Sequence, residues 1–168
     1  MAWIFWARNE EFWILDFGFW IEEAFQNAMD ERDFKERTYQ LALRIIRLVE
    51  ALPKTATGSV IGKQLIRCGT SIGANYRAAC RGRSAPDVIA KLGIVEEEAD
   101  ETLYWLELLI EANVLSRKRL EPLMKETGEI LAMTVASIKT LRVSANRVRS
   151  TQQANRYLNP KSKIQNPK

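Results

Sequence analysis

The chain has 168 residues, and its 25 Lys and Arg against 21 Asp and Glu give a formal net charge of +4. A chain of this length fits one domain and is long enough to bury a core. It contains no histidine, which removes the commonest general base at neutral pH and the commonest zinc ligand. Its two cysteines, Cys68 and Cys80, provide neither a zinc ribbon nor a disulfide framework, and they fit a reducing cytoplasm. Composition therefore argues against a triad hydrolase and against a zinc enzyme.

Aromatic residues concentrate at the N-terminus, where nine of the 15 fall within the first 25 positions. Charged residues interrupt this segment, so it resembles neither a membrane span nor a signal peptide. Its apolar period is ambiguous between strand and helix. We expect residues 1–28 to form an extension outside the core. The alternatives are sequence upstream of a start at Met29, or an interfacial helix that touches a membrane or a partner.

Charge alternates in blocks along the chain. Residues 1–50 carry six basic and ten acidic residues, residues 51–86 six and none, residues 87–129 five and eleven, and residues 130–168 eight and none. On successive helices, such blocks let acidic and basic surfaces face one another within a bundle or between subunits.

Apolar residues recur at helical spacing in the first half of the chain. One stripe runs over residues 34–52 and ends before Pro53, which cannot continue a helix. We interpret the Thr-Ala-Thr-Gly stretch at 55–58 as a short link. A second stripe follows over residues 61–81. Two helices are therefore predicted here.

Two further helices are predicted in the second half. Ser84, followed three positions later by Asp87, has the pattern of a helix cap before a long apolar stripe that reaches Ile110. Ser116 is the expected cap of a fourth helix, whose stripe ends at Leu141.

Four helices joined by short connections place sequential neighbours antiparallel. The sequence therefore predicts an all-α protein, an up-down-up-down four-helix bundle over residues 29–149. From residue 150 the periodicity is lost, and Gln, Asn, Pro and Lys become frequent. We expect residues 150–168 to be a disordered basic tail.

The second predicted helix has a basic stripe opposite its apolar face. This stripe consists of Lys63, Arg67, Arg77 and Arg81. These four residues could form a solvated face, contact phosphate, or pair with carboxylates of an acidic helix. A third stripe consists of Gly62, Gly69 and Gly73. Glycine destabilises a helix relative to alanine, so three glycines on one face indicate close packing against another helix.

The third predicted helix carries a dense acidic cluster. Its members are Glu96, Glu97, Glu98, Asp100 and Glu101. A di-iron site would need histidines, which the chain lacks, so we predict no metal and no cofactor. One or two of these carboxylates are expected to meet Arg67 or Arg77 across a packed interface. Trp105 is expected to anchor the core or an interface.

Three stretches together carry a family resemblance. Residues 64–76, the Arg83-Ser84 turn and residues 91–101 resemble the four helix bundle protein family, also called the 23S rRNA intervening-sequence-encoded protein family. The likeness runs from about Phe34 to Leu141. The family is also described as ribosomal-protein-like.

The resemblance implies an antiparallel bundle that assembles into a barrel-like homopentamer with no known enzymatic activity. Relatives include the accessory variability protein of diversity-generating retroelements, which partners a reverse transcriptase and nucleic acid. After Asn75 many members read Ile-Ala-Glu-Gly, whereas this chain reads Tyr-Arg-Ala-Ala-Cys-Arg-Gly. A basic neighbourhood thus replaces an acidic position.

We therefore expect a non-catalytic, cytoplasmic oligomer, not associated with a membrane, that binds structured RNA or DNA, or a nucleoprotein partner. The expected nucleic-acid contacts are Lys63, Arg67, Arg77, Arg81, Arg83, Arg142, Arg147 and Arg149. The alternative is a purely structural oligomer, or an accessory protein of a reverse transcriptase. In the structural oligomer the basic stripe docks on the acidic surface of the next subunit. The interface or ion-pair residues would then be Glu96, Glu97, Glu98, Glu101 and Trp105. The sequence gives Ser71 and Asn75 no clear role.

Overall fold

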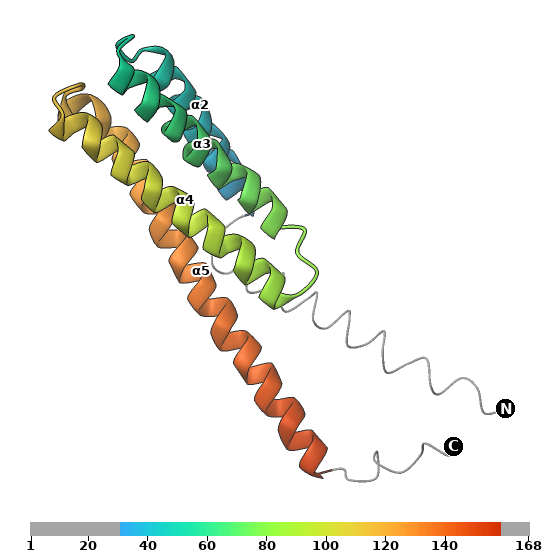
Figure 1. The fold of residues 1–168 in the computed structure, drawn as a ribbon. Helices are drawn as coiled ribbons and strands as arrows, with labels where there is room; N and C mark the ends of the chain where they lie inside the picture. Colours follow the sequence, from blue (N-terminus) through green and yellow to red (C-terminus); the bar gives the residue numbers. More distant parts are fainter. Residues whose placement is uncertain (1–30, 159–168) are drawn as a thin grey trace.

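The computed structural model describes residues 31–158, which form four helices (Figure 1). Their bounds are α2 (Glu31–Glu50), α3 (Ala56–Ala79), α4 (Ala85–Glu111) and α5 (Arg117–Leu158). No strand occurs within this described range. The predicted extension at 1–28 lies outside the described residues, as do positions 159–168 of the predicted tail.

The helices are arranged as an antiparallel bundle. The α2–α3 and α4–α5 connections lie at one end of the molecule and the α3–α4 turn lies at the other (Figure 1). Each helix packs on its neighbour in sequence, and α2 also contacts α5. The predicted all-α four-helix fold is therefore confirmed.

The core is built from the predicted apolar stripes. Phe34, Leu41 and Ile45 of α2 are buried against α3, where Leu65 and Ile72 are fully covered. The rings of Phe34 and Tyr76 lie 4.3 Å apart, between centroids. Burial of apolar side chains at this spacing supplies most of the stability of a bundle, because isolated helices of this length are marginal in water.

Helix α3 begins earlier than predicted. Its first residue is Ala56, and Thr55 caps it by accepting a hydrogen bond from the Gly58 backbone N–H at 3.0 Å. The stretch at 55–58 is therefore the cap and first turn of α3, not a link. A Cβ at Gly58 would collide with the Pro53 carbonyl oxygen, so glycine allows the chain to turn tightly between α2 and α3.

The caps of α4 and α5 differ. The Ser84 hydroxyl accepts a hydrogen bond from the Asp87 N–H at 3.3 Å, while Asp87 accepts one from the Arg83 N–H at 3.1 Å. The predicted cap of α4 is thus confirmed. Helix α5 begins directly after Ser116, as predicted, but the Ser116 side chain makes no hydrogen bond with any described residue.

Helix α5 is longer than predicted. It spans 42 residues and continues through Leu158, although Leu141 is the last buried residue among its described side chains. The first nine residues of the predicted disordered tail are therefore helical. The loss of apolar periodicity marks where α5 stops packing against the bundle, not where the helix ends. No proline or glycine occurs between Leu141 and Pro160 to break the helix, and proline disfavours helix at the residue before it. Helix α5 thus runs past the ends of the other three helices (Figure 1).

Arg37 of α2 forms ion pairs with two glutamates of α5. The Arg37 guanidinium donates to Glu126 at 2.9 Å and to Glu129 at 2.7 Å, and it lies 3.1 Å from the Met133 sulfur. The Arg37 side chain is 24% exposed. These contacts fix the register in which α2 and α5 run antiparallel.

Candidate nucleic-acid interface

The predicted basic stripe of α3 does not form one site. Lys63 lies in the second turn of α3 and Arg81 lies just past its end, about 27 Å apart along the helix axis. Both are exposed, as are Arg77 and Arg83. Within the described part of the chain, none of these four side chains has a carboxylate within 4 Å.

Arg67 is the exception, because it is bound to α4. Its guanidinium lies 3.4 Å from a Glu98 oxygen and also pairs closely with Glu101. The expected meeting of Arg67 with the acidic cluster is confirmed, and both helices belong to the same chain. Arg67 is therefore engaged with carboxylates and is not a free cation for phosphate.

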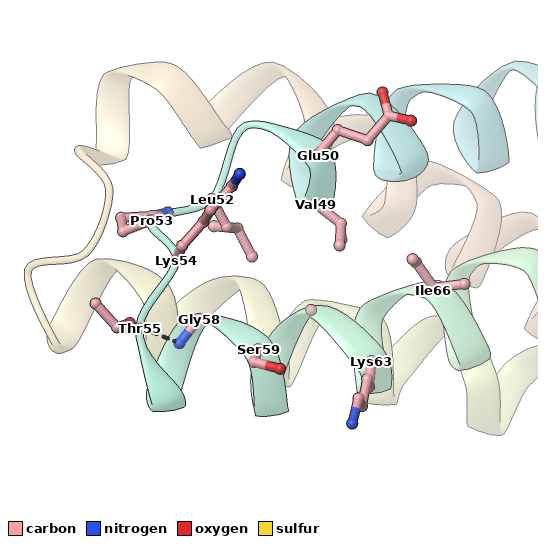
Figure 2. A pocket seen from close by; sticks show the side chains of 11 residues that line it. Val49, Glu50, Leu52, Pro53, Lys54, Thr55, Gly58, Ser59, Lys63 and Ile66 are labelled. Atoms are coloured by element: carbon pink, nitrogen blue, oxygen red, sulfur yellow. Dashed lines mark hydrogen bonds between the residues drawn. The ribbon is translucent and has the colours of Figure 1, made fainter.

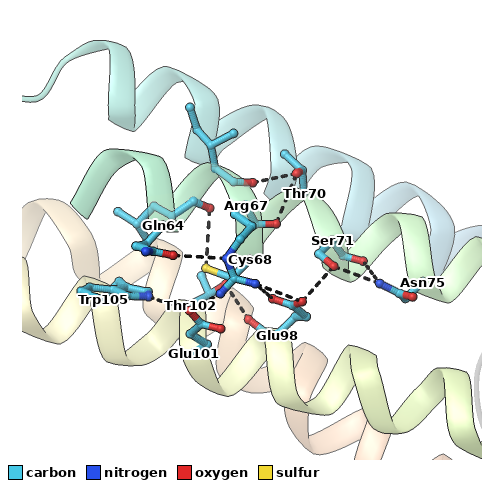
Figure 3. A network of polar contacts seen from close by, with 12 residues as sticks. Gln64, Arg67, Cys68, Thr70, Ser71, Asn75, Glu98, Glu101, Thr102 and Trp105 are labelled. Carbon is cyan, nitrogen blue, oxygen red and sulfur yellow. Dashed lines mark hydrogen bonds and ion pairs between the residues drawn. The ribbon is translucent and has the colours of Figure 1, made fainter. Parts of the chain in front are cut away.

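The Arg67 pair is part of a polar network along the α3–α4 interface (Figure 3). The Trp105 indole N–H donates to Glu101 at 3.0 Å, and the Ser71 hydroxyl donates to Glu98 at 3.1 Å. Asn75 donates to the Ser71 hydroxyl at 2.9 Å. This network aligns two helices, which gives Ser71 and Asn75 a structural role.

The network also perturbs one carboxyl group. Hydrogen bonds from Arg67, and secondarily from Trp105, hold the pKa of Glu101 below its ordinary value. These donors bind the charged carboxylate more strongly than the neutral carboxyl group, so Glu101 stays ionised. Such a carboxylate is a poor proton acceptor at neutral pH, so the network does not provide a general base.

The remaining acidic cluster faces outward. Glu96 is half-buried and Glu97 is exposed. Neither takes part in an ion pair with a described residue. The neighbouring ring of Tyr104 is 53% exposed, whereas Trp105 is half-buried and packs against the core, as expected.

Exposed arginines gather at one end of the bundle. Arg81 and Arg83 lie in the α3–α4 turn, and α5 projects from this same end (Figure 1). The projecting part of α5 holds Arg142, Arg147 and Arg149, all exposed. Residues 142–158 contain no acidic residue. We call these five arginines the basic end.

The arginines of α5 flank its inner stripe on both sides. At 100° per residue, Arg142 and Arg149 fall on one side of the line through Leu141, Ala145 and Val148, and Arg147 falls on the other. Positive charge therefore surrounds the projecting helix.

Lys63 belongs to a different feature, at the opposite end of the bundle. An open cavity of about 510 Å³ lies where the α2–α3 turn meets the start of α3 (Figure 2). Lys63, Lys54 and Glu50 line it, together with Val49 and Ile66. This cavity was not predicted from the sequence; the Leu-Pro ending of α2 and the glycine at position 58 were the signals that could have located it.

The structure offers little for catalysis or metal binding. Within residues 31–158, no group of three or more Cys, Asp or Glu residues is placed to hold a metal ion. Burial raises the pKa of the Cys68 thiol and of the Cys80 thiol, so both disfavour the reactive thiolate. Within the same range, no helix is long and apolar enough to cross a membrane.

Comparison with known proteins decides the family. A family description, the 23S rRNA-intervening sequence protein, matches residues 30–136. This match covers more than half of the chain. The chain belongs to the 23S rRNA-intervening sequence protein family.

A solved relative agrees with this assignment. The chain is similar to a protein of unknown function from the S23 ribosomal protein family of Bacteroides thetaiotaomicron, with 39% identity and a TM-score of 0.62. The similarity covers 66% of this chain and 99% of the relative. The comparison with curated proteins gave no match.

The family match has an informative boundary. It includes every predicted site residue of α3 and α4 but ends at residue 136. Arg142, Arg147 and Arg149 therefore lie beyond it, in the projecting part of α5. The basic end thus combines a turn inside the family match with a helical segment outside it.

Proposed function

We propose that this protein is a non-catalytic oligomer that binds structured nucleic acid through the basic end. One observation carries the proposal: five exposed arginines gather at the end from which α5 projects, and none of their guanidinium groups forms an ion pair with a described carboxylate. Free cations on a projecting helix suit phosphate contact, because each neutralised phosphate releases condensed counterions.

Two further observations support a binding role over catalysis. The chain has no histidine, and its two thiols are shifted toward the unreactive form. The Ser71 hydroxyl and Glu98 belong to the α3–α4 network, which also includes Arg67.

Both cysteines are free, which fits a reducing compartment such as the cytoplasm.

The purely structural alternative loses part of its basis. It required Arg67 to dock on the acidic cluster of another subunit, but Arg67 already pairs with Glu98 and Glu101 of its own chain. Self-association itself is favoured by exposed apolar side chains on three helices. These are Tyr39, Val60, Ile66 and Tyr104. We therefore propose an oligomer, for which the resemblance implies five copies; light scattering on the purified chain would measure this number.

Binding is tested with fluorescent ribosomal-RNA stem-loops and a duplex DNA of equal length at about 50 mM salt, where electrostatic binding is strong. The informative variant replaces Arg142, Arg147 and Arg149 with Gln. Its matched control replaces Arg117, Lys118 and Arg119 with Gln, which removes the same charge from the other end of the same helix.

The proposal predicts that the first variant loses about tenfold or more in affinity, because three phosphate contacts are removed. The control variant should stay within about twofold of the parent. Absence of binding by the parent chain to both nucleic acids would refute the proposal. Equal losses in the two variants would also refute it, because they would show a response to net charge alone.

A further inference from the structure

The outer face of the projecting part of α5 has a composition of its own. At 100° per residue, four side chains form one stripe on the side opposite Leu141, Ala145 and Val148. They are Val143, Asn146, Ser150 and Gln153, which follow one another at steps of three, four and three and are all exposed. This stripe, which we call the outer stripe, therefore presents an apolar side chain, a hydroxyl and two carboxamides, and no charge.

The arginines of α5 flank the outer stripe on both sides. Arg142 and Arg149 lie about 60–80° to one side of its centre, and Arg147 lies about 80° to the other side. A solvated helix is commonly supported by opposite charges four residues apart, but residues 142–158 contain no acidic residue. An uncharged polar stripe between flanking arginines suits a helix that contacts bases with its centre and phosphates with its edges.

The outer stripe carries groups that recognise base edges. The carboxamides of Asn146 and Gln153 make no hydrogen bond with any described residue. Each carboxamide can accept and donate at once, which matches the acceptor and the donor that adenine shows in the major groove. The Ser150 hydroxyl donates to the Asn146 carbonyl oxygen at 3.0 Å and keeps its lone pairs for another donor. The methyl groups of Val143 suit contact with the thymine methyl, so the stripe favours A·T pairs.

The dimensions of this helix suit the major groove of duplex DNA. A helix with its side chains is about 10–12 Å across, and the major groove of B-form DNA is about 12 Å wide. From Val143 to Gln153 the helix rises about 15 Å, which spans about four base pairs. No described helix blocks the outer stripe, because α5 runs beyond the other three (Figure 1). The major groove of A-form RNA, in contrast, is too deep and narrow for side chains to read.

We propose that the projecting part of α5 enters the major groove of duplex DNA. Its outer stripe faces base edges there, and Arg142, Arg147 and Arg149 contact phosphates on both sides. This assignment rests on the proposed function, since it names duplex DNA as the nucleic acid that the basic end binds. It adds a preference for DNA over RNA and a preference for A·T pairs where the outer stripe meets the bases.

Binding to modified duplexes tests the groove. The full chain is titrated with a fluorescent duplex DNA of about 20 base pairs and with a duplex RNA of the same sequence. A third duplex carries glucosylated hydroxymethylcytosine, whose sugar at C5 fills the major groove. The control duplex has inosine in place of guanine, which changes only the minor groove. We expect the RNA and the sugar-bearing DNA to bind about tenfold or more weakly than plain DNA, and the inosine DNA to stay within about twofold.

Selection from a randomised pool of the same duplex DNA tests the contacts with bases. We expect the parent chain to enrich a shared element rich in A·T pairs. N146A/Q153A should bind the enriched DNA about tenfold or more weakly but the unselected pool within about twofold, because it loses both carboxamides and keeps the arginines. Alanine favours helix, so this variant keeps α5. Q40A removes an exposed carboxamide from α2 and is the control, which should change neither affinity.

Three results would overturn this assignment while leaving the proposed function in place. They are equal binding of the DNA and RNA duplexes, equal binding of the plain and sugar-bearing DNA, and selection that yields no element lost in N146A/Q153A. A parent chain that binds neither DNA nor RNA gives a different result, because it would refute the proposed function and this assignment together.

Discussion

Arg67 lies on the outer side of α3, and its guanidinium is bound to two carboxylates of α4. Its side chain is 52% exposed, so the pair is screened by solvent and its main effect is on alignment of the helices and on local ionisation. The sequence placed Arg67 on the correct face of its helix. It could not decide between phosphate and carboxylate as partner, because the choice depends on the register between α3 and α4.

The ionisation of Glu101 tests this arrangement. R67M should raise the pKa of the Glu101 carboxyl toward its ordinary value, because the hydrogen bond from Arg67 is the largest cause of its lowering. Carbon-detected NMR titration of the Glu side chains measures the change. K63M is the control, since Lys63 is exposed and has no described ion pair. An unchanged Glu101 titration in R67M would contradict the described pairing.

The same shift has a consequence for stability. A carboxyl whose pKa is lower in the folded state stabilises the fold above its unfolded-state pKa. This contribution is lost as pH falls through the folded-state value. The stability difference between R67M and the parent should therefore be larger at pH 7 than in acid below that value, as measured by urea unfolding. A difference that grows on acidification would have the wrong sign.

At the scale of helices, the glycines of α3 set how closely it approaches α2. A Cβ at Gly69 would collide with the Ile45 side chain, and one at Gly62 would lie 2.9 Å from Val49 Cγ1. At Gly73 the nearest atom is 3.5 Å away, an ordinary contact. The predicted tight crossing is therefore confirmed for two of the three glycines.

Substitution of these glycines separates packing from helix propensity. G69A should lower the free energy of unfolding by about 1–3 kcal/mol, because it overpacks the α2–α3 contact. G93A should raise it by up to about 1 kcal/mol, since a Cβ at Gly93 meets nothing within 4 Å and alanine favours helix. Urea unfolding measures both. Equal effects of the two substitutions would contradict the described approach of α2 and α3.

The caps offer a second test of the helices. S84A should lower the free energy of unfolding by about 1 kcal/mol, because the Ser84 hydroxyl caps α4. S116A should have a smaller effect, since the Ser116 side chain has no described hydrogen bond. Thermal unfolding of the two variants measures the difference. A larger loss in S116A would show that the cap is at the start of α5 instead.

The sequence predicted the helices more accurately than their ends. Apolar spacing located the stripes of Phe34 and Leu65 correctly, because burial of one face is what creates the pattern. It missed the first turn of α3, where Thr55 and Gly58 act through the backbone. It also ended α5 too early, because a projecting helix has no core to maintain its apolar period.

For the whole molecule, the predicted site divides into three parts. Lys63 lines the cavity at one end, Arg67 belongs to the α3–α4 network, and the basic end lies at the other end of the bundle. Residue types and helix faces were predictable from the sequence. The division of the site into three parts could not be predicted, because it depends on which end of each antiparallel helix a residue occupies.

The salt dependence of binding shows most directly whether the basic end contacts phosphate. The slope of log affinity against log salt concentration counts the phosphates that the protein neutralises, at about 0.9 per contact for duplex DNA. The measurement compares the parent chain, the Gln variant at Arg142, Arg147 and Arg149, and the Gln variant at Arg117, Lys118 and Arg119. We expect the first variant to lower the magnitude of the slope by about 2–3 and the second to leave it unchanged. An identical slope in the parent and the first variant would contradict binding through the basic end.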